Sequence, residues 1–276
     1  MKRAILVSFG LVALAVLPAA AADMPVKAPP PAPPAPVFSW TGFYIGGNAG
    51  AAINDTSHTL DPSGCFLTGC GAGGVAANPL RTFSSRFNQA AFTGGGQIGY
   101  NWQFAPAWVV GFETDFNFNG LNQTDTVVQV LAAPLAGTFN HSVSHRHDWF
   151  GTARARLGWL PIDRVMLYAT GGLAYGQVAS STAAFFPASL DTYAGSISTT
   201  RVGWTAGGGI EWAFTNNWTA KAEYLFVDLG SVSYTDACIA ACGVLAPAYQ
   251  TGVTTREHIA RVGINYLFNA GPGSRY

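Results

Sequence analysis

Residues 108–119 place apolar side chains on one face of the chain and polar side chains on the other. In an extended strand, alternate residues point to opposite sides. One face therefore carries Trp108, Val110, Phe112, Thr114, Phe116 and Phe118, and the other carries Val109, Gly111, Glu113, Asp115, Asn117 and Asn119. A charge that faces lipid at the bilayer midplane costs about 2–4 kcal/mol for Arg or Lys and somewhat less for an acid. If the apolar face meets lipid, Glu113 and Asp115 must point into the interior of a closed sheet.

An internal repeat extends this pattern. Trp102-x-Phe104-x3-Trp108-x4-Glu113 recurs as Trp212-x-Phe214-x3-Trp218-x4-Glu223, and each copy predicts two strands joined by a short turn. A third tight turn is expected near Pro161-Ile162-Asp163. The whole chain then predicts eight strands, at residues 40–54, 88–104, 108–121, 144–160, 164–180, 199–214, 218–235 and 254–268.

The connections between these segments alternate between long and short. Short turns at one end and long loops at the other are typical of a bacterial outer-membrane barrel. The predicted fold class is therefore all-β, an eight-stranded antiparallel transmembrane β-barrel. A soluble barrel of lipocalin type is the alternative, but it would not need Trp, Phe and Tyr facing outward along every strand. The aromatic residues beside the short turns are expected to form a girdle at the membrane interface.

Composition excludes other classes of protein. Only 10% of the residues are charged and the formal net charge is zero, so nothing indicates binding to nucleic acid. Beyond the N-terminal region, no apolar run reaches the roughly 20 residues that a membrane helix needs. A closed barrel is the remaining way to span a bilayer.

The N-terminus has the anatomy of a secretory signal peptide. A short basic region, Met1-Lys2-Arg3, precedes an apolar stretch at residues 4–19 and a small-residue cleavage site, Ala20-Ala21-Ala22. A transmembrane anchor is the alternative. The predicted organisation is a signal peptide at 1–22, a Pro-rich periplasmic linker at 23–39, the barrel at 40–268 and a short C-terminal extension at 269–276.

The strand pattern directs ten charged side chains into the barrel and leaves Asp228 on the lipid side, where we expect it at the outer rim. Eight strands enclose a lumen that side chains can fill, and buried charges need partners. A structural plug of ion pairs is one interpretation, and a narrow gated ion path is the other. A symmetric turn at Phe214–Trp218 would place Glu211 across from Lys221. The inward set is Glu113, Asp115, Arg154, Arg156, Arg201, Glu211, Lys221, Glu223, Glu257 and Arg261.

The cysteines are expected in the long loops, His58 in the first of these loops, and the other three histidines in or just above the strand at 144–160. Cys65 and Cys70 fall in the first long loop, and Cys238 and Cys242 in the fourth. Two bridges within the loops are the simplest interpretation of an even number in an exported protein, and a link between the two loops is the alternative. The histidines could be solvated loop residues or could hold a metal or haem iron; they are His58, His141, His145 and His147. Nothing combines a nucleophile, a base and an orienting acid, so we expect no enzyme and no cofactor.

Several stretches also resemble a known family. "WTGFYIGGNAG", "GQIGYNW", "VVGFETDF", "LYATGGLAYG", "GWTAGGGIEWAFTNNWTAKAEYLFVDLG" and "RVGINYLF" are similar to the small porin-family outer-membrane barrels of alphaproteobacteria, relatives of the OmpA-like transmembrane barrel. The resemblance covers about residues 40–268. Such barrels usually stop at an aromatic residue, here Phe268, but this chain continues to Tyr276.

The resemblance implies location in the outer membrane and roles in envelope integrity, surface exposure or weak pore activity. Some members are described as hemin-binding, so capture of hemin or metal by the outer loops is the alternative function. The expected partners are outer-membrane lipid, lipopolysaccharide, the barrel-assembly machinery and an extracellular ligand bound through the long loops.

Overall fold

The computed structural model describes residues 38–63, 83–131, 137–187, 190–241 and 248–269. The chain divides into Met1–Pro36 and Val37–Tyr276, and every strand belongs to the second unit. The signal peptide, most of the linker and the C-terminal extension lie outside the described residues and stay predictions. Among the described residues, no helix is long and apolar enough to cross a membrane.

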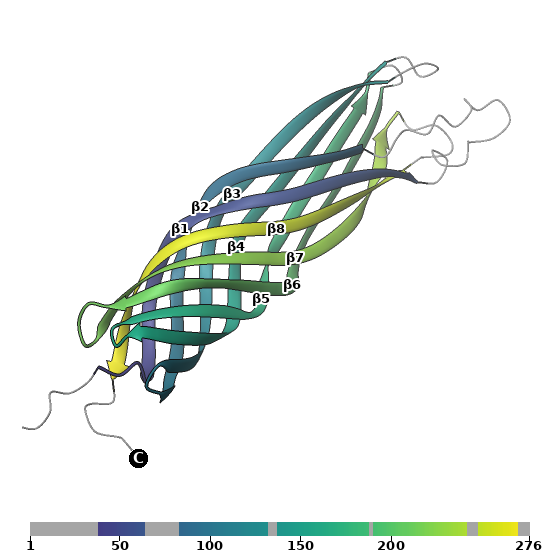
Figure 1. The fold of residues 1–276 in the computed structure, drawn as a ribbon. Helices are drawn as coiled ribbons and strands as arrows, with labels where there is room; N and C mark the ends of the chain where they lie inside the picture. Colours follow the sequence, from purple (N-terminus) through teal and green to yellow (C-terminus); the bar gives the residue numbers. More distant parts are fainter. Residues whose placement is uncertain (1–37, 64–82, 132–136, 188–189, 242–247, 270–276) are drawn as a thin grey trace, which may run out of the picture. The chain divides into compact units, whose positions relative to one another are not determined.

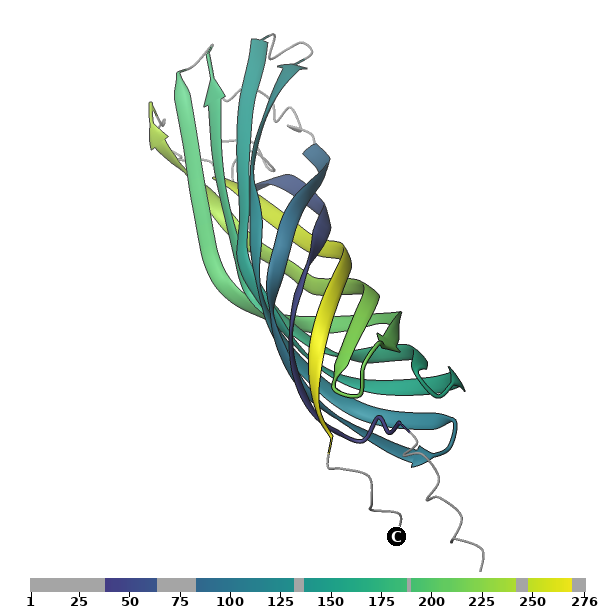
Figure 2. The same cartoon turned by 90° about the vertical axis from the view of Figure 1, so that its left-hand side faces the viewer.

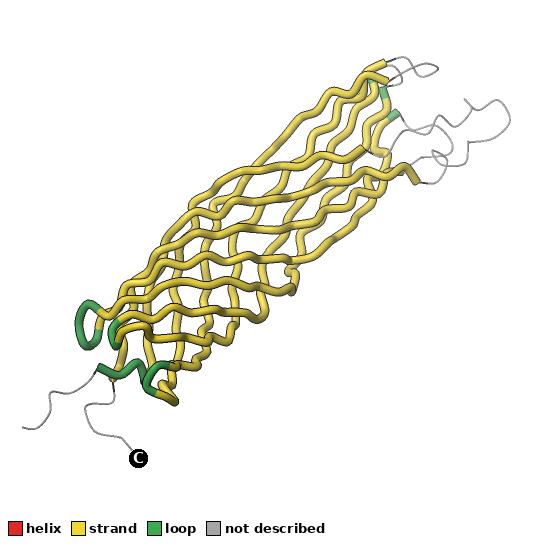
Figure 3. The backbone as a smooth tube through the Cα atoms, viewed as in Figure 1, coloured by secondary structure: helices red, strands yellow, loops and turns green. Residues whose placement is uncertain are grey.

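Eight antiparallel strands form one closed ring (Figures 1 and 3), so the predicted fold class is confirmed. Each strand pairs with its neighbours in the sequence, and β1 pairs with β8 along its whole length to close the ring. Short turns join β2 to β3, β4 to β5 and β6 to β7 at one end. The strands are β1 (Gly42–Ser63), β2 (Phe83–Ala105), β3 (Trp108–Leu131), β4 (Gly137–Ile162), β5 (Val165–Phe186), β6 (Asp191–Ala213), β7 (Trp218–Ala240) and β8 (Ala248–Asn269).

An apolar belt covers the outside of the ring from the short turns to about the middle of the strands. It ends near Ile53, Phe92, Phe118 and Val202, all of which are exposed, and near the partly buried Phe226. The predicted aromatic girdle borders the belt beside the short turns, with exposed Trp102, Phe104, Trp108, Trp159, Trp212, Phe214 and Trp218. A belt with this girdle matches the surface that a barrel presents to lipid.

The strands continue beyond the belt, further than the sequence pattern predicts. We call this part the outer extension; it comprises residues 54–63, 83–92, 119–131, 137–148, 176–186, 191–203, 228–240 and 248–258. Its outward side chains are mostly polar, such as Arg86, Thr124 and Arg146. Asp228 lies at the boundary, as expected, and binds Arg256 at 3.0 Å. Its Oδ1 atom also accepts a hydrogen bond from the nitrogen of Gly230, whose φ of 74° forms a bulge.

The ring flattens in the outer extension into two facing sheets. The ladder between β2 and β3 stops at Thr93 and Asn119, and that between β6 and β7 is interrupted between Ala194 and Trp204. Strands β7, β8, β1 and β2 therefore form one sheet, and β3, β4, β5 and β6 form the other. Their inner faces touch: the hydroxyl of Tyr234 on β7 lies 2.5 Å from that of Thr182 on β5.

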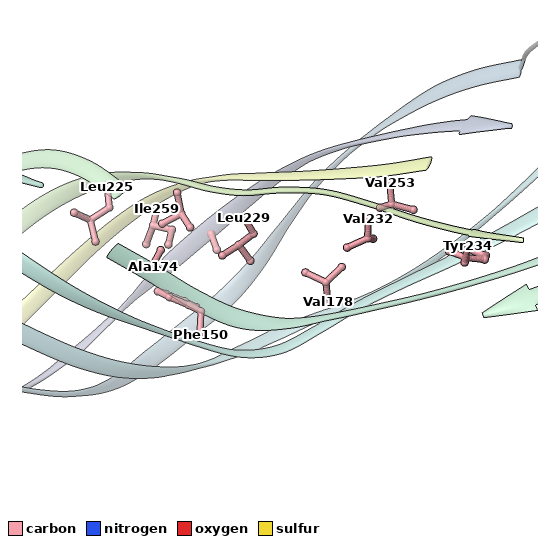
Figure 4. Packing of buried hydrophobic residues seen from close by; sticks show 11 residues of the cluster. Phe150, Ala174, Val178, Leu225, Leu229, Val232, Tyr234, Val253 and Ile259 are labelled. Carbon is pink, nitrogen blue, oxygen red and sulfur yellow. The ribbon is translucent and has the colours of Figure 1, made fainter. Parts of the chain in front are cut away.

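Side chains fill the interior in layers. At the short-turn end, Trp40 is fully buried, and its Nε1 donates to the carbonyl of Asp163 at 2.9 Å. Charged residues occupy the next layer. Beyond them, the inward residues of β7 change to Leu225 and Val227, in an apolar cluster shared with β4, β5 and β8 (Figure 4). A second apolar cluster closes the outer end, with Leu60, Phe139, Ala184, Phe186, Tyr193 and Tyr249.

Candidate functional site

A network of ion pairs fills the barrel interior at the level of the apolar belt. Its members come from five strands, because every second residue of each strand points inward. Each member is at most 5% exposed. The acids are Glu113 and Asp115 on β3, Glu211 on β6 and Glu223 on β7, and the bases are Arg154 and Arg156 on β4, Lys221 on β7 and Arg261 on β8.

Arg154 lies at the centre of the network and binds three carboxylates. Its Nη1 atom donates to Glu223 at 2.9 Å, and its Nη2 atom donates to Asp115 at 3.0 Å and also to Glu113. The guanidinium fork has several donors in fixed directions, which suits it to several acceptors at once. Glu113 on β3 lies directly opposite Arg154 in the β3–β4 ladder.

Arg156 connects the network to the opposite wall. Its Nη2 atom donates to Glu211 at 2.6 Å, its Nη1 atom donates to the hydroxyl of Tyr44 at 2.8 Å, and its guanidinium lies 4.0 Å from the centre of the Tyr168 ring. The Tyr44 hydroxyl in turn donates to Glu113 at 2.8 Å. Arg156 therefore bridges β4 to β6 across the lumen.

Lys221 and Arg261 complete the charge balance. The Lys221 ammonium donates to Glu113 at 2.9 Å, and Arg261 binds Asp115 and Glu223, both at 2.7 Å. Glu211 and Lys221 are ladder partners, as a symmetric turn requires. Their ion pairs are nevertheless with other residues: Glu211 binds Arg156 on β4, and Lys221 binds Glu113 on β3 and Glu223 on its own strand.

Neutral residues that the charge pattern did not single out belong to the same network. Tyr44 is one, and a Cβ atom at Gly99 would overlap its ring, so the glycine provides the space for it. Asn265 donates to Glu211 at 2.8 Å and accepts from Gln97 at 2.6 Å. The inward parity of β1, β2 and β8 is the sequence signal that could have identified them.

Two residues of the predicted inward set lie outside this network. Arg201 is partly exposed and donates to the carbonyl of Ser231 at 2.9 Å, because it lies in the part of β6 whose ladder with β7 is interrupted. Glu257 is buried in a higher layer, where it binds His147 and accepts from Asn119 at 3.1 Å. The expectation of one set of ten paired charges is corrected in these two places.

All four histidines lie in strands and point inward, which corrects the expectation of a loop position for His58 and the interpretation of all four as solvated residues. His58 belongs to β1, the other three belong to β4, and all are buried. The rings of His58 and His145 face each other across the outer extension with centres 5.9 Å apart. Burial lowers the pKa of His58 to about 3 and that of His145 to about 4, so both are neutral at pH 7. Among the described residues, no group of three or more His, Cys, Asp or Glu side chains is arranged to hold a metal ion.

Cys238 lies in β7 rather than in a loop, close to the apolar cluster at the outer end, and it is disulfide-bonded. Cys65, Cys70 and Cys242 lie outside the described residues, so the connectivity of the bridges stays open.

The arrangement of the interior favours holding charge in place over moving it. Each cation of the network contacts at least one carboxylate. An apolar cluster lies on each side of the network, and the outer cluster shares its level with the buried polar group of Asn119, His147 and Glu257. An ion that crosses would have to displace these ion pairs and then pass the packed apolar side chains.

Comparisons with known proteins agree with the geometry. The family model for "Outer membrane protein beta-barrel domain" matches residues 9–268. A 31 kDa outer-membrane immunogenic protein of Brucella melitensis is 37% identical, over 97% of this chain and all of the relative. A 22 kDa outer membrane protein of Rhizobium leguminosarum is 30% identical, over 74% of this chain and 71% of the relative. Among solved structures, the outer membrane protein OprG of Pseudomonas aeruginosa is 12% identical with a TM-score of 0.44, over 84% of this chain and 99% of that one.

Proposed function

This chain belongs to the outer membrane protein β-barrel family, and from that premise we propose a structural and surface-interaction role in the outer membrane with at most weak pore activity. In this family the short turns face the periplasm and the long connections face the cell exterior. The outer extension is then the part of the protein that meets the outside of the cell.

The observation that carries the closed-lumen proposal is the ion-pair network. An eight-stranded barrel leaves room for little more than its inward side chains, and here those side chains bind one another across the lumen. Arg154, for example, contacts acids on both β3 and β7. Removing one partner of a buried pair leaves an uncompensated charge and costs about 3–5 kcal/mol, so the network resists opening.

Conductance across a planar bilayer tests this proposal. We expect purified, refolded protein to give no large stable channel. Glu211→Gln should leak in brief events, because Arg156 loses its charged acceptor on β6. A large, steady conductance from the unmodified protein would contradict a closed lumen.

The surface role is supported by the outer extension and by the relatives. Proteins of Brucella that are similar over nearly the whole chain are named immunogenic, and exposure at the cell surface would account for such a property here. Lipopolysaccharide would meet the outward polar residues at the top of the belt, including Arg86 and Arg256. The barrel-assembly machinery is the partner that insertion of such a barrel requires.

The alternative, capture of hemin or metal by the outer loops, has less support. The histidine set suggested it, but all four of these side chains are at most 3% exposed, so their rings are not presented to a ligand that arrives from outside. A spectral titration decides the matter: an unchanged Soret band after mixing with hemin is expected. We also propose that the protein is not an enzyme.

A further inference from the structure

We propose that the opening between β2 and β3 in the outer extension binds an extended polypeptide segment of a partner protein, which adds to the free edge of β3 as a further strand. The proposal rests on the surface role proposed above and names the site and the kind of partner. Figures 1 and 2 show the two strands parting and ending well apart.

Both edges of this opening are free along most of the extension. The β2–β3 ladder ends at Thr93 and Asn119, so among the described residues 83–92 and 120–131 have no partner on the side where these strands face each other. Each segment is still held extended by its other neighbour: β2 pairs with β1 as far as Phe83, and β3 pairs with β4 as far as Leu131. Two rows of backbone donors and acceptors are thus fixed in strand geometry and open to pairing.

The interruption between β6 and β7 is different in kind. Those strands pair again beyond it, at Tyr193 with Cys238 and at Thr192 with Ala240. That interruption is therefore closed at both ends, whereas the opening between β2 and β3 widens from a closed base. Only an opening of the second kind lets a strand enter from outside.

The edge of β3 carries little of the usual protection against strand addition. Native edges are blunted by Lys, Pro, bulges or inward charges. Residues 120–131, "GLNQTDTVVQVL", contain no Lys and no Pro, and their single charge is Asp125, on the inward face. The register irregularity with β4 lies at the base of this edge, between Phe118 and Leu121, and leaves the rest of it regular. Near the outer end, Val128 and Val130 are 61% and 79% exposed on the outward face.

These features define the partner's chemistry. Main-chain groups of the edge recognise another extended main chain and give affinity, while alternate side chains give selectivity. A segment with β-branched or aromatic residues at alternate positions would cover Val128 and Val130. The edge lies beyond the apolar belt, so an aqueous peptide can reach it.

Hydrogen exchange of the full chain in lipid nanodiscs tests the proposal. The probe is a synthetic peptide, FSSRFNQAAF, which copies residues 83–92 and would continue the register that pairs Thr93 with Asn119. The amides of residues 120–130 that point away from β4 should exchange readily in the free protein and slow by about tenfold or more when the peptide pairs with them. The same peptide with proline in place of the residue copied from Asn88 should give no protection.

A variant with a charge on the edge and a matched control test whether the peptide binds at the free edge of β3. Val128→Lys places a charge on the free edge and should abolish the protection by the peptide. Ser142→Lys makes the same change on β4, whose position 142 is paired with both β3 and β5, and should keep it. Protection of the edge-facing amides of residues 120–130 in the monomer without any peptide would overturn the proposal. Protection that appears in a dimer and disappears on dilution would also overturn it, because a second copy would then be the occupant. Neither result would change the conductance measurement that tests the closed lumen, so the two proposals can fail separately.

Discussion

Arg154 is the residue on which most of the interior charge balance depends. It is fully buried and binds Glu113, Asp115 and Glu223. Arg154→Met would leave these carboxylates with less positive charge and no comparable donors. The expected loss is about 3–5 kcal/mol in the free energy of unfolding, measured by urea unfolding in lipid vesicles with tryptophan fluorescence.

The matched control for this change is Arg256→Met. Arg256 also pairs with an acid, Asp228, but its side chain is half exposed at the rim. An exposed pair contributes about 0–1 kcal/mol, so this variant should unfold almost like the unmodified protein. Equal stability of the two variants would mean that the buried network does not hold the barrel.

Sequence parity fixes which way a residue faces but not what it binds. Glu113 and Arg154 are both inward by parity and are neighbours in the ladder. Arg156 also binds Glu211, two strands away from β4, and no local pattern encodes that contact. Long side chains cross a narrow lumen, so their partners depend on strand order and stagger around the whole ring.

At the scale of the strand, the sequence predicts the part in contact with lipid better than the part outside it. In the belt, outward Phe and Trp alternate with inward polar residues, which is a strong pattern. In the outer extension the outward residues are mostly polar, with many Ser and Thr, and the inward ones include His58 and His145. Polar residues on both faces look like a loop, so the strands were expected to end early and the histidines to be solvated.

Burial of these histidines makes the outer extension sensitive to acid. The pKa of His58 is lowered to about 3 and that of His145 to about 4 by burial. Between the unfolded value of about 6.5 and these values, the unfolded strands bind more protons than the folded ones. Stability of the extension therefore falls as pH falls through this range. After correction for the slower intrinsic exchange of amides in acid, hydrogen exchange in the outer parts of β1 and β4 should be faster at pH 4.5 than at pH 7.

Two variants test whether the buried histidines cause the acid loosening. His58→Phe together with His145→Phe should weaken the acid loosening, and the remainder should come from His141, whose pKa burial also lowers to about 4. His258→Phe, on the outward face where the ring bonds Tyr224, should retain it. Asp236 acts in the opposite direction, since burial raises its pKa to about 6 and its protonation favours the folded state below that pH. Unchanged exchange of the unmodified protein between pH 7 and pH 4.5 would contradict this account.

At the scale of the whole molecule, the closed ladder and the interior network should hold the barrel together, and the cysteines should not. Cys238 is at the outer end of β7, far along the strand from Lys221 and Glu223. A bridge there constrains the exterior end, and a bridge that closes a short loop restricts the unfolded chain only modestly. The β1–β8 ladder that closes the ring is continuous without it.

Reduction should therefore leave the folded barrel intact. Unheated protein should run as the same compact band on a gel with and without reductant, and Cys238→Ser should behave likewise. Every backbone group in the belt stays paired within the ring, and unpairing it in lipid would cost several kcal/mol per group, so loss of an exterior bridge cannot start unfolding there. Arg154→Met in the same gel should lose the compact band at a lower temperature. If reductant alone moves the unmodified protein to the unfolded position, the cysteines hold the barrel and the network does not.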